Sequence, residues 1–223
     1  MSESTFVLVP GAGGNATYWS RLVAELERRG HAAVAVDLPE DDPSLELADW
    51  AALVDAAVPA DGDTIGVFQS LGGFLAPLVR SPLRAVVLLN AMVPVPGETP
   101  GEWWDAVGSQ HARRDAAIAG GYPTEFDLDT YFLHDVPPEV LARLPGDNRA
   151  PSDTPFAQPC TFECWPDVPL HVVTGADDRF FPLDLQRRVA ADRLGIEIDV
   201  LPGGHLVALS RAADLADRLA AYV

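Results

Sequence analysis

Lysine is absent from this chain of 223 residues, whose 15 basic residues are all arginine. Without lysine the protein cannot form a Schiff base with a carbonyl substrate, and it has no lysine general base. Basic charge is also scarce overall, because 33 acidic residues bring the net charge to −18 and the isoelectric point to about 4.4. This balance argues against nucleic acid or an anionic membrane as a partner. We therefore expect the partner to be a small-molecule substrate.

Cysteine and long apolar runs are scarce as well. Cys160 and Cys164 are the only two cysteines. They are close enough in sequence to pair, but we expect reduced thiols, and two cysteines do not make a metal site. We also expect no cofactor. No apolar run approaches the roughly 18 residues that a membrane-spanning helix requires. The N-terminus has no basic stretch, and residues 6–9 are too short for a signal peptide core. We expect a cytoplasmic, single-domain protein.

Six short apolar runs, rich in Val, Leu and Ile, alternate along the chain with helical patterns. The absence of polar alternation predicts parallel strands buried on both faces, and the strand–helix rhythm predicts an α/β fold with a doubly wound sheet. We expect His31 at the surface and His171 packed within a strand. The expected strands are residues 6–9, 32–36, 65–68, 85–89, 170–174 and 197–201, and the main helices are residues 18–29, 45–58, 184–194 and 212–222.

One long segment interrupts this rhythm. Residues 94–165 lack strand patterns and are dense in Pro, Gly and aromatic residues. So long a structureless loop is improbable in a compact domain, so we expect a small helical cap there, with helices at 102–119 and 138–144. Residues 1–93 and 166–223 would form the core. We expect the cap to cover a substrate pocket with Trp103, Trp104 and Phe132, although such aromatic residues can also merely pin a cap to its core.

Ser70 stands at a predicted strand-to-helix corner. Residues 64–68 read as a buried strand and residues 71–80 as a helix. A serine at such a corner exposes its hydroxyl at the helix N-terminus, where the N–H of Leu71 can stabilise an oxyanion. The pattern departs from G-x-S-x-G because Phe68 stands where the first glycine is expected. The alternative is a plain turn, but the downstream residues favour a nucleophile.

An acid and a histidine follow at two later strand ends. Asp177 and Asp178 lie in a loop after one strand, and His205 follows two glycines after the next. Serine, acid and histidine in this chain order match one of the three known arrangements of serine-hydrolase triads. The spacing favours Asp178 as the acid, which leaves Asp177 to cap a helix or face water. We expect Ser70, His205 and Asp178 to form a catalytic triad.

Short motifs at the ends of the strands give the chain a family resemblance. It resembles the α/β-hydrolase superfamily along nearly its whole length, and in particular small bacterial esterases related to plant esterases and hydroxynitrile lyases. The motifs are VPGAGG at residues 9–14, DLP at 37–39, QSLGG at 69–73, NAMVP at 90–94, GADD at 175–178 with Pro182, and GGHL at 203–206.

The resemblance implies a mostly parallel six-stranded sheet in the order 2-1-3-4-5-6, without the two antiparallel strands that lead the family fold. It also implies Ser70 as nucleophile, His205 as base and Asp178 as acid. The backbone N–H groups of Ala12 and Leu71 would form the oxyanion hole.

Three positions depart from the family pattern. Pro10 and Gln69 each replace a histidine outside the triad, which leaves the expected chemistry intact. Phe68 is the more serious departure, since this position usually stays small so that the elbow can approach the neighbouring strand. Either the phenyl ring packs sideways in a slightly opened elbow, or the serine is misaligned and catalysis is weak.

These features together predict a serine hydrolase resembling carboxylic ester hydrolases. It would cleave an ester or related acyl bond of a small to medium apolar substrate through an acyl-serine intermediate. One alternative is a non-hydrolytic lyase or cyclase that uses the same triad. Another is a ligand-binding protein with weak turnover, an interpretation that Phe68 favours.

Overall fold

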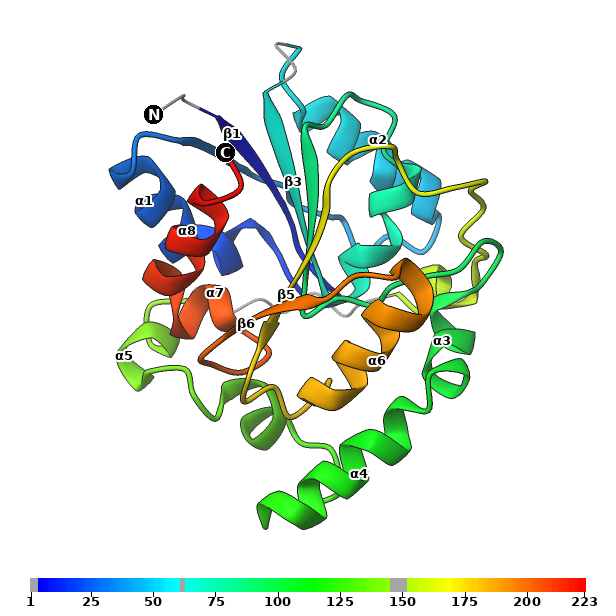
Figure 1. Ribbon diagram of the computed structural model, residues 1–223, viewed down its shortest axis with the longest axis vertical. Coiled ribbons are helices and arrows are strands. Elements are labelled where there is room, and N and C mark those ends of the chain that lie inside the picture. The colour runs from blue at the N-terminus through cyan, green and yellow to red at the C-terminus, as the bar shows by residue number, and fades with distance from the viewer. Residues whose placement is uncertain (1–3, 61–62, 145–151) are drawn as a thin grey trace.

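The computed structural model describes residues 4–60, 63–144 and 152–223. Six parallel strands form one sheet in the order β2-β1-β3-β4-β5-β6, which confirms the predicted order (Figure 1). The strands are β1 Thr5–Val9, β2 Ala32–Ala35, β3 Thr64–Gln69, β4 Ala85–Leu89, β5 Leu170–Gly175 and β6 Ile198–Leu201.

Helices cover both faces of the sheet, and the side chains of β1 show how the two layers divide. Val7 and Val9 point into the cluster shared with α2 and α6, whereas Phe6 and Leu8 point into the cluster shared with α1 and α8. Successive strand residues face opposite sides, so a strand without polar residues is buried on both. The helices are α1 Ser20–Arg28, α2 Leu47–Ala57, α3 Pro100–Ala106, α4 Ser109–Gly120, α5 Pro138–Leu141, α6 Leu183–Leu194, α7 Val207–Ser210 and α8 Ala212–Ala220.

The helix predicted for residues 71–80 is wrong. Two short 3₁₀ turns replace it, η2 at Ser70–Phe74 and η3 at Ala76–Leu78. Pro77 explains the break, because it has no N–H to donate to Gly73 and its ring would collide with that carbonyl. Gly72 and Gly73 further weaken any α-helix. The serine therefore begins a tight 3₁₀ turn rather than a long helix.

The segment between β4 and β5 contains helices and no strand among its described residues. The expected helix 102–119 is divided into α3 and α4 by Gly108, whose φ of 63° is unfavourable for other residues. The expected helix 138–144 is the single turn α5. The other short helical turns in the described residues are the 3₁₀ turns η1 Ala16–Trp19 and η5 Thr154–Ala157 and the π-helical turn η4 Asp129–Leu133.

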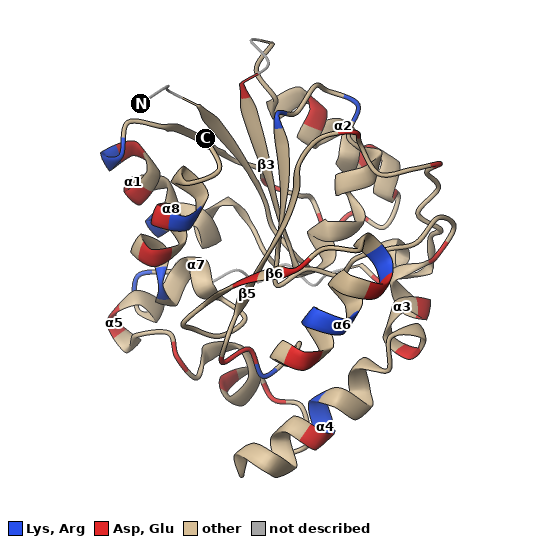
Figure 2. Ribbon diagram, in the orientation of Figure 1, with Lys and Arg blue, Asp and Glu red and all other residues tan. Residues whose placement is uncertain are grey.

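Among the described residues, Asp, Glu and Arg lie on helices and loops except for Asp199 in β6, and β1 and β3 carry no charged residue (Figure 2). His31 differs from its predicted surface position: it is buried, its Nδ1 accepts a hydrogen bond from the Ser4 N–H, and its ring stands edge-on to Phe6. No helix in the described ranges is long and apolar enough to cross a membrane.

Candidate active site

The Ser70 backbone is held in a strained conformation at the carboxyl end of β3. Its φ is 50°, and among the described non-glycine residues only Asn90 shares a positive φ. Such a conformation persists only where the surroundings enforce it, which is typical of a nucleophile elbow. Gly72 and Gly73 permit it: a β-carbon at Gly72 would lie 2.6 Å from the Pro10 oxygen, and one at Gly73 would lie 2.1 Å from the Met92 oxygen.

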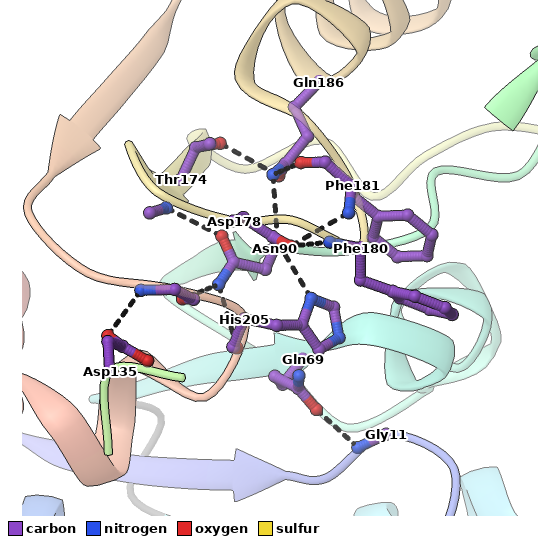
Figure 3. Close-up of polar contacts among 12 residues, drawn as sticks. Gly11, Gln69, Asn90, Asp135, Thr174, Asp178, Phe180, Phe181, Gln186 and His205 are labelled. Carbon is purple, nitrogen blue, oxygen red and sulfur yellow. Dashed lines mark hydrogen bonds and ion pairs between the residues drawn. The ribbon is translucent and has the colours of Figure 1, made fainter. Parts of the chain in front are cut away.

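His205 and Asp178 form a buried pair. His205 Nδ1 lies 2.8 Å from Asp178 Oδ2, and both side chains are fully buried (Figure 3). Because the carboxylate accepts at Nδ1, the hydrogen-bond network assigns the proton to that nitrogen and leaves Nε2 as the acceptor. Nε2 is buried and has no hydrogen-bond partner within the described part of the chain. This is the arrangement that a general base requires.

The Asp178 carboxylate is fixed from several sides. Its Oδ1 accepts hydrogen bonds from the N–H groups of Phe180 (2.8 Å) and Phe181 (2.9 Å), and its Oδ2 accepts a longer one from Gln186 Nε2 (3.3 Å). Gln186 is itself held, because its Oε1 accepts from Thr174 Oγ1 at 3.0 Å. These bonds keep Asp178 pointed at the imidazole.

Asp177 has a different environment. It is exposed, and its Oδ2 accepts a hydrogen bond from the Gly203 N–H at 3.1 Å. Asp177 therefore binds the backbone of the loop that carries His205 and makes no hydrogen bond to the His205 ring. Of the two acids left open by the sequence, the geometry brings Asp178 to the histidine.

Asn90, which sequence reasoning did not single out as a site residue, joins the two loops. Its Nδ2 donates to the carbonyl oxygens of Gly204 (3.1 Å) and His205 (3.0 Å), while its Oδ1 accepts from the Gly175 N–H (2.8 Å). The side chain is fully buried. Its position directly after β4 could have pointed to it, because functional residues of parallel sheets gather at carboxyl ends of strands.

The histidine also contacts the cap. Its ring stands edge-on to the rings of Phe132 and Phe181, with centroids 4.7 and 5.2 Å away. Asp135, just after η4, accepts a hydrogen bond from the Gly204 N–H at 2.7 Å. The cap segment after α4 therefore touches the same loop that presents the base.

A cavity of about 600 Å³ opens above Ser70 and His205. Ala12, which the resemblance assigns to the oxyanion hole, lines this cavity, whereas the Leu71 side chain packs in the core. Burial raises the pKa of Tyr18 and keeps its phenol neutral at this wall. The other lining residues are Gly13, Gly14, Asn15, Thr17, Gln69, Phe126, Leu128, Phe132, Leu133, Leu144, Phe156, Leu206 and Leu209.

Of the three aromatic residues predicted to line the pocket, the structure places one at the cavity and two elsewhere. Phe132 lines the cavity, but neither Trp103 nor Trp104 does. Trp103, on α3 of the cap, is buried against the core, where its Nε1 donates to the Val93 carbonyl at 3.1 Å, and Trp104 packs against it with ring centroids 5.6 Å apart. The two tryptophans pin α3 to the core, which is the alternative that the sequence left open. No cluster of three potential metal ligands occurs in the described ranges.

Several solved structures that are similar to this chain are hydrolases, and they share a low sequence identity with it. A pyrethroid hydrolase from Sphingobium faniae JZ-2 superposes with a TM-score of 0.75 at 21% identity, covering 99% of this chain and 97% of that one. A polyneuridine aldehyde esterase gives 0.75 at 17%, covering 99% of each. The methylesterase MES16 from Arabidopsis gives 0.73 at 18%, covering 98% of each. No curated protein matches the chain.

The family model described as the alpha/beta hydrolase family matches residues 6–218, which include the elbow and all six described strands apart from Thr5, the first residue of β1. The match agrees with the sheet order, the strained serine and the histidine–acid pair described above. The chain therefore belongs to the α/β-hydrolase family.

Proposed function

We propose that this protein is a serine hydrolase, similar to carboxylic ester hydrolases, that acts through an acyl-serine intermediate. The observation that carries the proposal is His205: its Nδ1 is bonded to buried Asp178, its Nε2 has no partner within the described residues, and it lines one cavity with Ser70. The names of the similar structures, a pyrethroid hydrolase and two esterases, support the same reaction class.

Acylation begins when His205 Nε2 takes the proton of Ser70 Oγ and the oxygen attacks the carbonyl carbon of the substrate. The carbonyl oxygen becomes an oxyanion, which the N–H groups of Ala12 and Leu71 stabilise. The tetrahedral intermediate collapses, the ester C–O bond breaks, and the proton on Nε2 passes to the leaving alcohol. Asp178 holds the Nδ1 proton throughout and steadies the imidazolium.

Deacylation repeats these steps with water. His205 Nε2 takes a proton from water, the hydroxide attacks the acyl carbon, and the same N–H groups hold the second oxyanion. The bond to Ser70 Oγ then breaks and Nε2 returns its proton to the serine. The acid product leaves with one oxygen from water, and the enzyme is restored.

The cavity supports an uncharged, apolar substrate. No Asp, Glu or Arg occurs among the described residues that line it, and the cap contributes apolar side chains such as Phe126, Phe132 and Phe156. A volume of about 600 Å³ falls within the usual range for sites that enclose small to medium ligands. Esters, thioesters and lactones all present the required carbonyl carbon.

A series of p-nitrophenyl esters of increasing acyl length tests the proposal. The parent should hydrolyse at least one of them, and Ser70→Ala and His205→Ala should lose this activity. Ser109→Ala is a matched control, because Ser109 is also buried but its Oγ donates to the Trp104 carbonyl. A parent that binds these esters without turnover would instead support the ligand-binding alternative.

The lyase alternative requires a positive group beside the histidine. The hydroxynitrile lyases that the chain resembles place a lysine there, whereas Leu206 follows His205 here and the chain has no lysine. We expect no release of cyanide from mandelonitrile above the buffer rate. Cyanide release that disappears in Ser70→Ala would favour the lyase reading.

A further inference from the structure

We propose that Gln69 and Glu40 are positioning residues that set the oxyanion loop, residues 10–14, so that the Ala12 N–H remains as its free donor. This inference rests on the proposed function. Gln69 is the last residue of β3 and Glu40 lies in the turn after β2, and each side chain accepts a hydrogen bond from an N–H beside Ala12.

Gln69 holds the loop from the side of the nucleophile. Its Oε1 accepts a hydrogen bond from the Gly11 N–H at 2.9 Å, in a buried setting (Figure 3). Because the backbone supplies the hydrogen, the side-chain atom facing Gly11 must be the oxygen. A β-carbon at Gly11 would lie 2.6 Å from this oxygen and 2.6 Å from Ser70 Cβ. The loop and the nucleophile are thus held together by the residue that precedes the serine.

Glu40 holds the loop from the opposite side. It follows β2, its side chain is buried, and its Oε2 accepts a hydrogen bond from the Gly13 N–H. Its own backbone is anchored at both ends, because its N–H donates to the Leu38 carbonyl (2.9 Å) and its carbonyl accepts from the Ser152 N–H (2.7 Å). A buried carboxylate is costly unless it is bonded. Glu40 therefore connects the oxyanion loop to a backbone segment that is itself held by hydrogen bonds to Leu38 and Ser152.

The other two N–H groups of the oxyanion loop, those of Gly14 and Ala12, differ in their hydrogen bonding. The Gly14 N–H donates to the Gly11 carbonyl at 3.0 Å, so Gly11, Gly13 and Gly14 are all engaged. The Ala12 N–H makes no hydrogen bond within the described residues, and Ala12 lines the cavity with Ser70. A donor that is free and already oriented costs no reorganisation when the oxyanion forms. The two acceptors supply this orientation.

Variants that remove only the acceptors test this inference. Gln69→Met and Glu40→Met keep a side chain of similar length, whereas Glu40→Gln keeps an oxygen for the Gly13 N–H and removes the charge. Gln158→Met is the matched control, because Gln158 Oε1 likewise accepts a backbone N–H, that of Leu47 at 2.8 Å. Melting temperatures establish that each variant is folded.

The readouts are kcat and KM on the ester that the parent cleaves best, and inhibition by a trifluoromethyl ketone compared with its methyl ketone. Loss of an entire oxyanion donor costs about 10²–10³ in kcat, so we expect displacement of Ala12 to lower kcat by about tenfold or more in both methionine variants. KM should change by less than about twofold. The preference for the trifluoromethyl ketone, which forms an oxyanion with the serine, should fall in parallel.

We expect Glu40→Gln to restore kcat to within about threefold of the parent, and Gln158→Met to retain parental kinetics. Parental kcat in both Gln69→Met and Glu40→Met would overturn this inference and leave the proposed function intact. An equal loss of kcat in Glu40→Gln and Glu40→Met would also overturn it, since the acceptor would not be the cause. A parent that cleaves no ester would overturn the proposed function itself.

Discussion

The ring of Phe68 occupies the space that a side chain on Gly66 would need. A β-carbon at Gly66 would lie 2.6 Å from Phe68 Cε2, and Phe68 is fully buried. Residues two apart on a strand share a face, so the phenyl ring lies back along β3 over the glycine. Ser70 nevertheless keeps its φ of 50°. Of the two alternatives expected for Phe68, the structure shows the ring packed sideways along the strand, with the Ser70 backbone in the left-handed conformation.

This relationship predicts coupling between the two positions. Gly66→Ala should destabilise the protein by about 1–3 kcal/mol through overpacking, and Phe68→Ala by about 3–5 kcal/mol through cavity formation. In the double variant the alanine at 66 no longer meets a ring, so the loss should be smaller than the sum. Chemical denaturation of the four proteins measures this difference. Strict additivity would contradict the packing described here.

The two neighbouring acids should respond very differently to amidation. Asp178→Asn replaces the acceptor at His205 Nδ1 and should lower kcat by about 10⁴, as in a protease with the same triad logic. Asp177→Asn weakens one exposed contact to Gly203 and should cost less than about tenfold. Initial rates on one ester compare them. A larger loss at Asp177 would reverse the assignment of the acid.

Asn90 should help to position His205, because its side chain is hydrogen-bonded to the loop that carries this residue. Asn90→Gly tolerates the φ of 45° but removes three hydrogen bonds, and we expect kcat to fall by about 10- to 100-fold with little change in KM. Asn90→Asp keeps the acceptor for Gly175 but sets a carboxylate against two carbonyl oxygens, so it should melt lower than Asn90→Gly. Thermal unfolding and kinetics together check both. An Asn90→Asp variant as stable as the parent would contradict the hydrogen bonds from Asn90 to the Gly204 and His205 carbonyls.

His171 should contribute to the pH dependence of stability. Burial lowers the pKa of His171 in the folded protein, where its ring stacks on Tyr222. The unfolded chain has the ordinary histidine pKa of about 6.5, so it binds more protons just below that pH and the free energy of unfolding falls as the pH falls. His134, whose pKa burial also lowers, adds to the trend.

His171→Phe keeps an aromatic ring beside Tyr222 and cannot titrate. The free energy of unfolding should therefore change less steeply between about pH 7 and pH 5 than in the parent, although His134 still contributes. Denaturation at several pH values measures the slope. Identical slopes in the two proteins would show that His171 does not take part.

The sequence was most informative about the sheet. Runs such as residues 85–89 have no polar alternation, and that pattern alone indicates a strand buried on both faces. The triad candidates could be named because each follows a separate strand. Boundaries were less predictable: the helix expected after Ser70 fails at Pro77, where a local steric effect overrides the apolar pattern.

The cap was harder to predict, because the spacing of its aromatic residues does not indicate which side chains face the core and which face the cavity. Trp103 and Trp104 pack onto the core, whereas Phe132 lines the cavity. The positioning roles of Asn90 and Glu40 depend on contacts between residues far apart in sequence, such as the 85 positions that separate Asn90 from Gly175. No local pattern reveals such a contact.

The most direct test of the central claim is labelling by a fluorophosphonate, followed by mass spectrometry of the intact protein and its peptides. Because the chain has no lysine, trypsin releases Ser70 in the peptide of residues 30–80, where Ser44 is the only other serine. We predict one label per chain on Ser70, none in Ser70→Ala, and a melting temperature for that variant close to the parent's. An unlabelled parent, or a label that persists in Ser70→Ala, would contradict the assignment of Ser70 as the activated nucleophile.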